Sequence, residues 1–492
     1  MKKIILFLCL SLFSMIAKSQ SITEISKKIV EKYENYKDST LKDRRFKHSD
    51  LQILITRLDS NFKVQNIGFS AEDRAINLIS WGKGKKKILL WSQMHGNEPT
   101  ATAAIFDIFR FLAAQDEFDS LRKKLHSELT LHFIPMLNPD GAEVFERRTR
   151  LGIDMNRDAS RLQQPESMLL KQIRDTLNPD FGFNLHDQGR EHSIGYSDQP
   201  ATMSFLAPAY NYKKAINESR GNAMKLIAEL HQLLSVYIGG NIGRYYDGFE
   251  PRAFGDNIQK WGTSTILIES GGRRGDPEKQ YIRKMNFLAL LHSFQSIASK
   301  NYAKFNSLQY NKIPSNGSSL KELKIRKINY LFNKRTYILD LLMDRLEIGY
   351  NQDRNFYYQG SVNDVGDLEN LYFAYDEYNF AHLLAEDGKT FPQKMTSLEE
   401  IRNLNFRELY ENGYTSVILE TNDLSQIPLF SEFPVNILLN KSEKSNHLKP
   451  FSNPDLIFRD RNEKVRAVLI NGFVCDLEKD LPSVIKNALL YR

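Results

Sequence analysis

The chain contains 492 residues, of which 41% are hydrophobic and 26% are charged. This globular composition excludes wholesale disorder, a collagen-like repeat and a multispan membrane protein. Its 67 basic and 60 acidic side chains leave a net charge of +7, which is a weak field for a chain of this length and indicates no nucleic-acid partner. These figures predict one to three folded domains.

The first predicted element, over residues 1–19, is a signal peptide. Two lysines precede an apolar run over residues 4–17, and the small residues Ala17 and Ser19 stand before the expected cleavage point, as in secretory signals. The run is shorter than the about 20 residues that a membrane-spanning helix needs. We therefore expect no transmembrane segment, and export to the periplasm or the cell exterior. Cleavage would remove three lysines, lower the net charge from +7 to +4 and leave one cysteine, Cys475, which excludes an intramolecular disulfide.

Strand-like and helix-like segments alternate over residues 20–305. Short apolar runs predict strands at residues 51–57, 75–81, 87–92, 129–136, 181–185 and 263–269. Apolar side chains at helical spacing predict helices at residues 21–36, 99–114, 166–177, 209–235 and 279–299. The alternation predicts an α/β fold with a mixed, largely parallel sheet flanked by helices, and such sheets bind ligands at the carboxyl ends of their strands. The basic cluster at residues 83–87 is expected at the tip of a hairpin.

The pattern changes after residue 305. Residues 306–322 are polar and contain proline and glycine, which predicts a linker. Residues 323–492 are expected to form a β-rich C-terminal domain, for which a β-sandwich is one arrangement that fits. Its predicted strands are residues 327–332, 336–342, 345–350, 416–420, 435–439 and 467–475, with a helix at residues 397–411. We identify no chemistry in this domain, which could bind an unidentified partner, a sugar or a wall polymer.

A histidine and a glutamate stand three residues apart in His95-Gly96-Asn97-Glu98, between a predicted strand and a predicted helix. Both side chains can reach one ion, and a catalytic zinc site takes three such ligands and leaves one position open. His186 is the third candidate, because it directly follows a predicted strand. In isolation the first motif also fits a helix-capping turn, and the second fits an ordinary surface or core histidine. Of the other histidines, we expect His132 to be structural and keep His192 as a reserve ligand.

Four arginines follow the turn Asn138-Pro139-Asp140-Gly141 and lie within the eleven residues 147–157. They are Arg147, Arg148, Arg150 and Arg157. Such a cluster could bind a carboxylate through paired hydrogen bonds, or it could be a solvated charged face. Glu269 ends an apolar strand and precedes two glycines that follow Ser270. A desolvated general base would sit at such a place, although a glutamate at a strand end can equally face solvent.

Taken in order, these segments resemble the carboxypeptidase A-like zinc metallopeptidases. The resemblance extends over residues 21–302 and implies a mixed sheet of about eight strands and one catalytic Zn²⁺ per chain. By position it implies that the zinc ligands are His95, Glu98 and His186. It further implies a histidine-orienting Asp154, an oxyanion-stabilising Arg147, a carboxylate-binding pair Asn156 and Arg157, a general base Glu269 and a substrate-covering Tyr246. The implied activity is hydrolysis of the last peptide bond of a peptide with a free C-terminal carboxylate.

Several alternatives stay open at this point. Tyr246 is only the nearest tyrosine by its distance from Glu269. The residue preference at the cleaved end depends on Phe254, which would favour an apolar side chain, or on Asp256, which would favour a basic one. Two other functions fit the same scaffold, a zinc-dependent N-acyl amino acid deacylase and a non-catalytic binding protein. The sequence does not distinguish a peptide from a cell-wall substrate.

Overall fold

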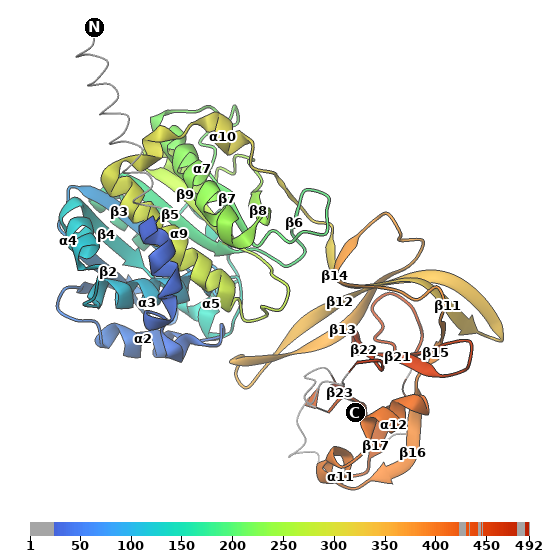
Figure 1. Cartoon of the computed structure of the whole chain (residues 1–492). Coiled ribbons are helices and arrows are strands. Elements are labelled where there is room, and N and C mark those ends of the chain that lie inside the picture. The colour runs from blue at the N-terminus through green and yellow to red at the C-terminus, as the bar shows by residue number, and fades with distance from the viewer. Residues whose placement is uncertain are drawn as a thin grey trace. The chain divides into compact units, whose positions relative to one another are not determined.

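The structure is a computed structural model that describes residues 24–422, 430–431, 433–440, 444, 446–479 and 488–491. The chain divides into two compact units, Met1–Ser318 and Ser319–Arg492 (Figure 1). The expected signal peptide at residues 1–19 lies outside the described residues, so the signal peptide and export stay predictions. Among the residues described, no helix has both the length and the apolar character to cross a membrane.

The first unit is built on an eight-stranded sheet with the strand order β1-β2-β4-β3-β5-β9-β7-β8. Its strands are β1 (Lys63–Phe69), β2 (Ala75–Gly82), β3 (Lys86–Ser92), β4 (Leu129–Ile134), β5 (Phe181–Asp187), β7 (Met203–Leu206), β8 (Ile242–Arg244) and β9 (Ser264–Ser270). The four central strands, β4, β3, β5 and β9, run parallel, while β1 with β2, β2 with β4 and β7 with β9 are antiparallel pairs. The predicted mixed, largely parallel sheet of about eight strands is therefore confirmed.

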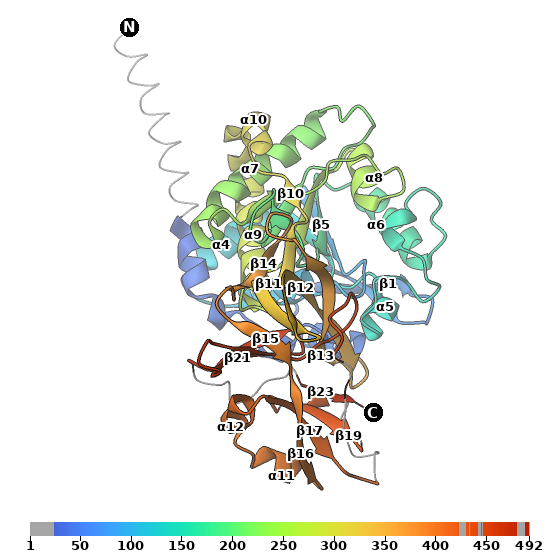
Figure 2. The same cartoon turned by 90° about the vertical axis from the view of Figure 1, so that its right-hand side faces the viewer.

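Helices cover both faces of this sheet. They are a first helix at residues 24–31, α2 (His48–Thr56), α3 (Thr100–Ala113), α4 (Asp119–Glu128), α5 (Pro139–Glu143), α6 (Pro165–Leu177), α7 (Glu218–Ile238), α8 (Phe254–Lys260), α9 (Gln280–Ser299) and α10 (Ser307–Asn311). Figure 2 shows α4, α7 and α9 on one side of the sheet, and α6 and α8 on the other. Alternate residues of β3 serve the two faces, since Ile88 and Leu90 pack with the first set while Leu89 and Trp91 pack with the second. Strands buried on both faces explain why the parallel segments read as continuous apolar runs.

Three expectations for this unit were wrong in detail. Of residues 51–57, predicted as a strand, all but the last belong to α2, because Leu51, Leu54 and Ile55 are buried at helical spacing. The cluster at residues 83–87 is not a hairpin tip, since β4 lies between β2 and β3 in the sheet. The helix predicted from residue 209 begins only at Glu218, where the Asn217 side chain caps it by accepting a hydrogen bond from the Arg220 amide.

The expected linker at residues 306–322 is not a linker in the structure. Helix α10 packs on α7, and Tyr310 is only 1% exposed. The short strand β10 (Asn316–Gly317) pairs with β6 (Ser193–Ile194) of the same unit. The compact unit therefore continues to Ser318, and residue 320 already begins the first strand of the second unit.

The second unit is β-rich, as expected. One sheet has the order β13-β12-β11-β15-β20-β21-β22, with β14 paired to β11, and a second has the order β16-β17-β19-β23-β18. The strands are β11 (Leu320–Phe332), β12 (Arg335–Tyr350), β13 (Asn355–Gly366), β14 (Phe373–Asn379), β15 (Leu384–Asp387), β16 (Lys389–Met395), β17 (Tyr414–Leu419), β18 (Phe430–Ser431), β19 (Asn436–Leu439), β20 (Leu456–Arg459), β21 (Val465–Ile470), β22 (Phe473–Asp476) and β23 (Ala488–Tyr491). The helix expected at residues 397–411 is two helices, α11 (Leu398–Arg402) and α12 (Phe406–Glu411), because the Asn405 side chain caps the second.

A β-sandwich does not describe this unit. Strands β16, β17, β19 and β23 of the smaller sheet are parallel neighbours, and α11 and α12 join β16 to β17. Parallel strands need such crossovers. Helix α12 contacts both β17 and β21, so it packs between strands of the two sheets, whereas the sheets of a sandwich face each other directly.

Candidate active site

A cavity of about 340 Å³ lies at the carboxyl ends of β3, β5 and β9. Neighbouring parallel strands end at the same edge of a sheet, which is where α/β folds bind ligands. The cavity wall includes every predicted site residue except Asp154: His95, Glu98, Arg147, Asn156, Arg157, His186, Tyr246 and Glu269. Residues far apart in the sequence thus meet in one place.

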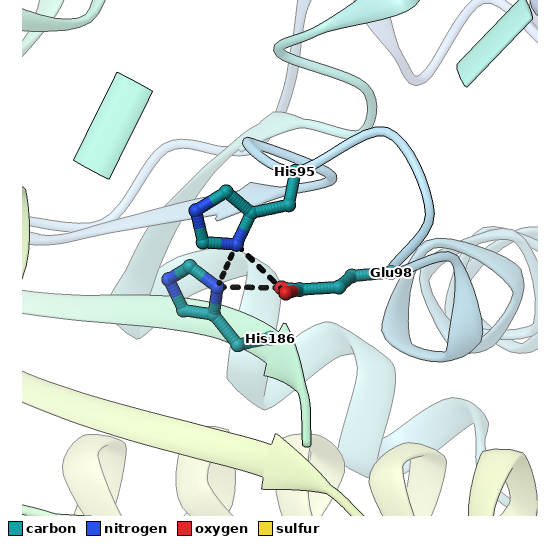
Figure 3. A group of neighbouring side chains, drawn as sticks. All are labelled: His95, Glu98 and His186. Carbon is teal, nitrogen blue, oxygen red and sulfur yellow. Dashed lines mark hydrogen bonds and ion pairs between the residues drawn. The ribbon is translucent and has the colours of Figure 1, made fainter. Parts of the chain in front are cut away.

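Three of these side chains converge on one point. Nδ1 of His95 lies 2.7 Å from Oε1 of Glu98, and Nδ1 of His186 lies 2.6 Å from Oε2 of the same carboxylate. The two Nδ1 atoms are 3.1 Å apart. Figure 3 shows the three groups pointing toward one another, two from the segment between β3 and α3 and one from β5. All three residues are buried.

Asp154 and Arg147 define the tautomer of His95. Nε2 of His95 lies 3.1 Å from Oδ1 of Asp154, and Nη1 of Arg147 lies 3.0 Å from Nδ1 of His95. A guanidinium can only donate, so Nδ1 is its acceptor, and Nε2 carries the hydrogen that it donates to Asp154. In this tautomer Nδ1 carries a lone pair rather than a hydrogen, as a metal ligand requires, and a carboxylate that fixes a metal-binding histidine in this way is common.

The electrostatics of the three residues fit a shared cation. Burial alone would lower the pKa of His95, but Glu98 and Asp154 raise it above its ordinary value. Burial keeps the pKa of His186 below its ordinary value despite Glu98. For Glu98 the two histidines outweigh burial and lower the pKa. Three lone-pair groups within about 3 Å of one another need a positive charge between them, and two histidines with one glutamate are a donor set of catalytic zinc.

The loop that carries His95 is held by a close backbone contact. A Cβ atom on Gly96 would lie 2.0 Å from the carbonyl carbon of Gly141, so only glycine fits there. The Asn138 amide donates to the Gln93 carbonyl at 2.9 Å, and the Asn138 side chain caps α5 by accepting from the Gly141 amide. The turn at residues 138–141 is therefore scaffolding for the loop that presents His95 and Glu98.

Glu269 stands beside the three residues, on β9. It is the register partner of His186 across the β5–β9 ladder and is 7% exposed. Burial raises its pKa well above the ordinary value, and the carboxylates of Glu98 and Asp187 raise it further. A carboxylate in these surroundings binds a proton more readily than one in water.

The arginine cluster is divided by the fold. Arg147 and Arg157 line the cavity, while Arg148 donates to the Gly152 carbonyl at 2.9 Å and Arg150 pairs with Glu72 at 2.7 Å. Arg157 is tethered, with Nη1 donating to the Asn156 carbonyl at 2.7 Å. Two of the four arginines thus line the cavity, where Arg147 pairs with Glu98 and Asp154, and Nε of Arg157 lies 3.5 Å from Oε2 of Glu250.

Asn156 is held at the cavity wall by its amide oxygen, which accepts a hydrogen bond from the Phe254 amide at 2.9 Å. That bond leaves the amide nitrogen of Asn156 to donate. The Phe254 side chain is fully buried in the core beneath α8 and is not part of the cavity wall, whereas Asp256 lines it. Burial, followed by the carboxylates of Glu250 and Asp247, raises the pKa of Asp256 to about 7.

The neighbouring tyrosines differ sharply. Tyr246 is 80% exposed and lies at the cavity wall. Tyr245 also lines the cavity, and burial, with the charges of Glu269 and Glu98, raises its pKa to about 12. Neither His132 nor His192 belongs to the cluster of His95, Glu98 and His186. His132 contacts Ser80 at 2.8 Å in the sheet, and His192 contacts the Gly317 carbonyl at 3.2 Å.

Three residues near the site were missed from the sequence. Tyr245 was passed over for its neighbour, and Asp187 directly follows His186, a proximity that could have indicated it. Lys279 reaches Asp187 with its Nζ at 3.0 Å. No local pattern indicates Lys279, because it lies before α9 and comes to the site only through the packing of that helix against the sheet.

Part of the chain is similar to known carboxypeptidases. Residues 48–233 match the family model of zinc carboxypeptidases. "Probable carboxypeptidase 2" of Trichophyton verrucosum is 27% identical over 104 residues, which cover 21% of this chain and 20% of that protein. "Carboxypeptidase 2" of Trichophyton rubrum is 27% identical over 104 residues, or 21% of this chain and 19% of that protein. The match thus spans about a fifth of these curated relatives.

Solved structures also show similarity. The metallo-carboxypeptidase of Burkholderia cenocepacia is 17% identical, with a TM-score of 0.41 over 52% of this chain and 69% of that one. The metallo-carboxypeptidase of Pseudomonas aeruginosa, solved with (2-guanidinoethylmercapto)succinic acid, is 15% identical, with a TM-score of 0.42 over 52% of this chain and 70% of that one. The segment matched by the family model carries His95, Glu98 and His186. Through this segment, residues 48–233 are similar to the zinc carboxypeptidases.

Proposed function

We propose that this protein is a zinc-dependent carboxypeptidase that removes the C-terminal residue of peptides. The observation that carries the proposal is the convergence of His95, Glu98 and His186 in a cavity that also holds Glu269 and Arg157. A metal-ligand set, a base and an anion-binding group are the three components that hydrolysis at a chain end requires.

The metal-binding role belongs to His95, Glu98 and His186, which would hold one Zn²⁺ per chain. Bound there, zinc supplies a Lewis acid beside the scissile carbonyl and makes water more acidic. Asp154 holds His95 in the metal-binding tautomer through the 3.1 Å contact with Nε2. Because Glu98 is buried, its carboxylate stays oriented by the two histidines and by the Asp187 amide, 3.2 Å away.

Glu269 is the general base of the proposal. It takes a proton from the attacking water and delivers it to the departing amine, and its raised pKa makes it a stronger base for the first of these two transfers. Arg147 donates hydrogen bonds to the oxygen that becomes negative as the carbonyl is attacked. Its guanidinium is 43% exposed and already lies 3.0 Å from Glu98 Oε1, at the mouth of the metal-ligand cluster.

Asn156 and Arg157 give the proposed enzyme its exopeptidase register. The Arg157 guanidinium and the Asn156 amide nitrogen can both donate to a terminal carboxylate. Only the end of a chain offers that group, so the bond presented to Glu269 is the last one. Tyr246, exposed at the cavity wall, covers the bound substrate in this proposal, and the half-buried Tyr245 is a second candidate for that contact.

The residue preference follows from Asp256. It is 8% exposed, it lines the cavity, and its hydrogen-bond donors are backbone amides such as that of Glu250 at 3.0 Å. A buried carboxylate without a cationic partner is costly, and a lysine or arginine side chain of the substrate would supply that partner. We therefore propose a preference for basic C-terminal residues rather than the apolar preference that Phe254 would have set.

The test is digestion of a defined peptide library, read by mass spectrometry, with and without a chelator. The expected result is loss of single C-terminal residues, lysine and arginine first, which stops when the metal is removed. Peptides with an amidated C-terminus should resist. Cleavage of amidated and free peptides at equal rates contradicts the exopeptidase proposal, and hydrolysis confined to N-acyl amino acids would make the chain a deacylase.

Arg157→Ala provides the matched variant for this test. It should raise KM for free-carboxylate peptides about tenfold or more with a smaller change in kcat, because it removes binding that substrate and transition state share. Arg148→Ala is the control, since Arg148 is exposed and contacts the Gly152 carbonyl rather than the cavity. Equal KM values for the two variants would remove Arg157 from the carboxylate site.

A further inference from the structure

Lys279 is a buried lysine immediately before α9. It is 8% exposed, and its backbone has a left-handed φ of 52°. Its Nζ donates to Asp187 Oδ2 at 3.0 Å and to the Ser270 carbonyl at 2.9 Å, and it lies 3.5 Å from the Gln188 carbonyl. Buried lysines are rare unless they are paired, and the partners of this ammonium therefore indicate what it does.

Lys279 contacts the last residue of each of the two strands that carry the proposed chemistry. Ser270 directly follows Glu269 on β9, and Asp187 directly follows His186 on β5. The ladder pairs His186 with Glu269 and Asp187 with Ser270. The ammonium therefore ties the ends of β5 and β9 together one residue beyond the metal ligand and the base.

Asp187 extends this tie to the third element of the site. Its Oδ2 also accepts from Thr100 Oγ1 at 2.5 Å, and its backbone amide donates to Glu98 Oε2 at 3.2 Å. Thr100 begins α3, two residues after Glu98. Lys279, Asp187 and Thr100 thus form a clamp that joins β9, β5 and the start of α3.

The positive charge of Lys279 compensates the negative charge of Asp187 within the clamp. Asp187 is buried, and within the described part of the chain its Oδ1 has no hydrogen-bond partner. Without the ammonium, the Asp187 carboxylate would be an unpaired charge near Glu98 and Glu269. The charge of Glu98 already raises the pKa of Asp187, and the charge of Asp187 raises the pKa of Glu269. An uncompensated buried charge is strongly unfavourable.

We propose that Lys279 is a positioning residue which, through Asp187 and Thr100, holds the Glu269 carboxylate in register with the His95–Glu98–His186 triad. This inference rests on the proposed function for its kinetic part but not for its metal-binding part. A purely structural ion pair would stabilise the fold and leave zinc affinity and kcat unchanged in the folded protein.

The test compares four full-length, zinc-loaded variants: Lys279→Met, Lys279→Met with Asp187→Asn, Thr100→Val, and the control Lys123→Met on exposed α4. Zinc affinity is measured by competition with a chelator, and kcat and KM with a blocked dipeptide ending in lysine. Lys279→Met should weaken zinc binding and lower kcat by about 10–100-fold, the usual effect of disturbing the residues that orient a metal ligand, with little change in KM. Adding Asp187→Asn should recover part of both losses, because it removes the unpaired charge.

Three outcomes overturn the inference. They are a Lys279→Met protein with the zinc affinity and kcat of Lys123→Met, equal losses in the single and double variants, and a fall confined to thermal stability. If Lys279→Met does not fold, Thr100→Val provides the test, because it replaces the hydroxyl by a methyl group of similar size. A zinc affinity lowered severalfold in Thr100→Val supports the clamp, and an unchanged zinc affinity refutes it. A wild-type chain with no peptidase activity would refute the proposed function, and the zinc affinities would still test the clamp.

Discussion

Glu269 shows how one side chain acquires a chemical role from its neighbours. It is buried on β9 among carboxylates, and its pKa rises because burial and the charges of Glu98 and Asp187 disfavour ionisation. Glu269→Gln keeps the shape and removes the proton acceptor. We expect kcat to fall by about 10²–10⁴-fold, the usual contribution of general acid–base catalysis, while bound zinc stays at one per chain. Kinetics combined with metal analysis of the same preparation checks this.

The matched control for that variant is Glu128→Gln. Glu128 is exposed at the end of α4, away from the cavity wall, so its kcat should equal that of the wild type. Glu269 would lose its assignment as the base if Glu269→Gln turned over within tenfold of Glu128→Gln. Loss of zinc from Glu269→Gln would instead indicate that the residue supports the metal site.

Asp256 predicts a pH dependence that only basic substrates share. Burial is the main cause of its pKa of about 7, so the carboxylate is largely protonated at pH 6 and largely ionised at pH 8. Lysine and arginine stay charged throughout this range. The KM for peptides ending in lysine should therefore fall about tenfold from pH 6 to pH 8, in step with the ionised fraction, relative to peptides ending in leucine.

The ratio of the two KM values is the quantity to measure, because it cancels titrations that affect both substrates. Asp256→Asn should abolish the pH dependence of this ratio and bring it close to one. A ratio that varies with pH equally in Asp256→Asn and in the wild type would show that another group sets it.

At the scale of elements, the loop between β3 and α3 is positioned by contact with the loop after β4. Gly96→Ala would place a methyl group 2.0 Å from the Gly141 carbonyl carbon, and backbone on both sides must move. We expect a loss of about 1–3 kcal/mol in stability, as for other overpacked sites, and zinc affinity at least tenfold lower, because His95 and Glu98 move with the loop. Urea unfolding and chelator competition measure the two effects.

Gly221→Ala is the control for this substitution. Gly221 lies within α7, and its added methyl would meet Ile216 Cγ2 at 3.7 Å, an ordinary contact. Alanine in a helix is more stable than glycine by about 1 kcal/mol, so this variant should be at least as stable as the wild type and bind zinc equally well. A Gly96→Ala protein that behaved in the same way would contradict the packing argument.

At the scale of the whole molecule, the boundary of the first unit can be tested by truncation. Residues 306–318 complete this unit, since the Tyr310 hydroxyl accepts from the Ala207 amide at 3.2 Å and Asn316 contacts Gln188 at 2.8 Å. A chain of residues 20–318 should keep the kcat/KM of the full chain. A chain of residues 20–305 should be less stable by about 3–5 kcal/mol or more, the cost of removing a buried aromatic side chain.

Thermal unfolding and peptide hydrolysis of the two truncated chains measure these effects. Equal stability of both chains would return the boundary to residue 305. A folded but inactive chain of residues 20–318 would make the second unit part of the catalytic apparatus. If the chain of residues 20–318 retained every binding property of the full chain, the second unit would have no role in binding a partner.

The sequence by itself determined the α/β class, the central strands and the segments that carry His95, Glu98, His186 and Glu269. These features are local: apolar runs mark buried strands, and polar residues at their ends mark the edge where parallel strands bind ligands. The family resemblance then supplied roles that spacing alone left open, as for Asp154 and Asn156.

Only the tertiary structure decided the remaining points. Residues predicted as a strand form part of α2, because their apolar side chains pack on the core at helical spacing. Strand β4 lies between β2 and β3, and the turn residues at 83–87 do not indicate this pairing with a distant strand. Asp256 rather than Phe254 faces the cavity because α8 turns the phenyl ring into the core. Lys279 reaches the site through the packing of α9 on the sheet. Each of these depends on contacts between segments far apart in the chain, which local patterns do not specify.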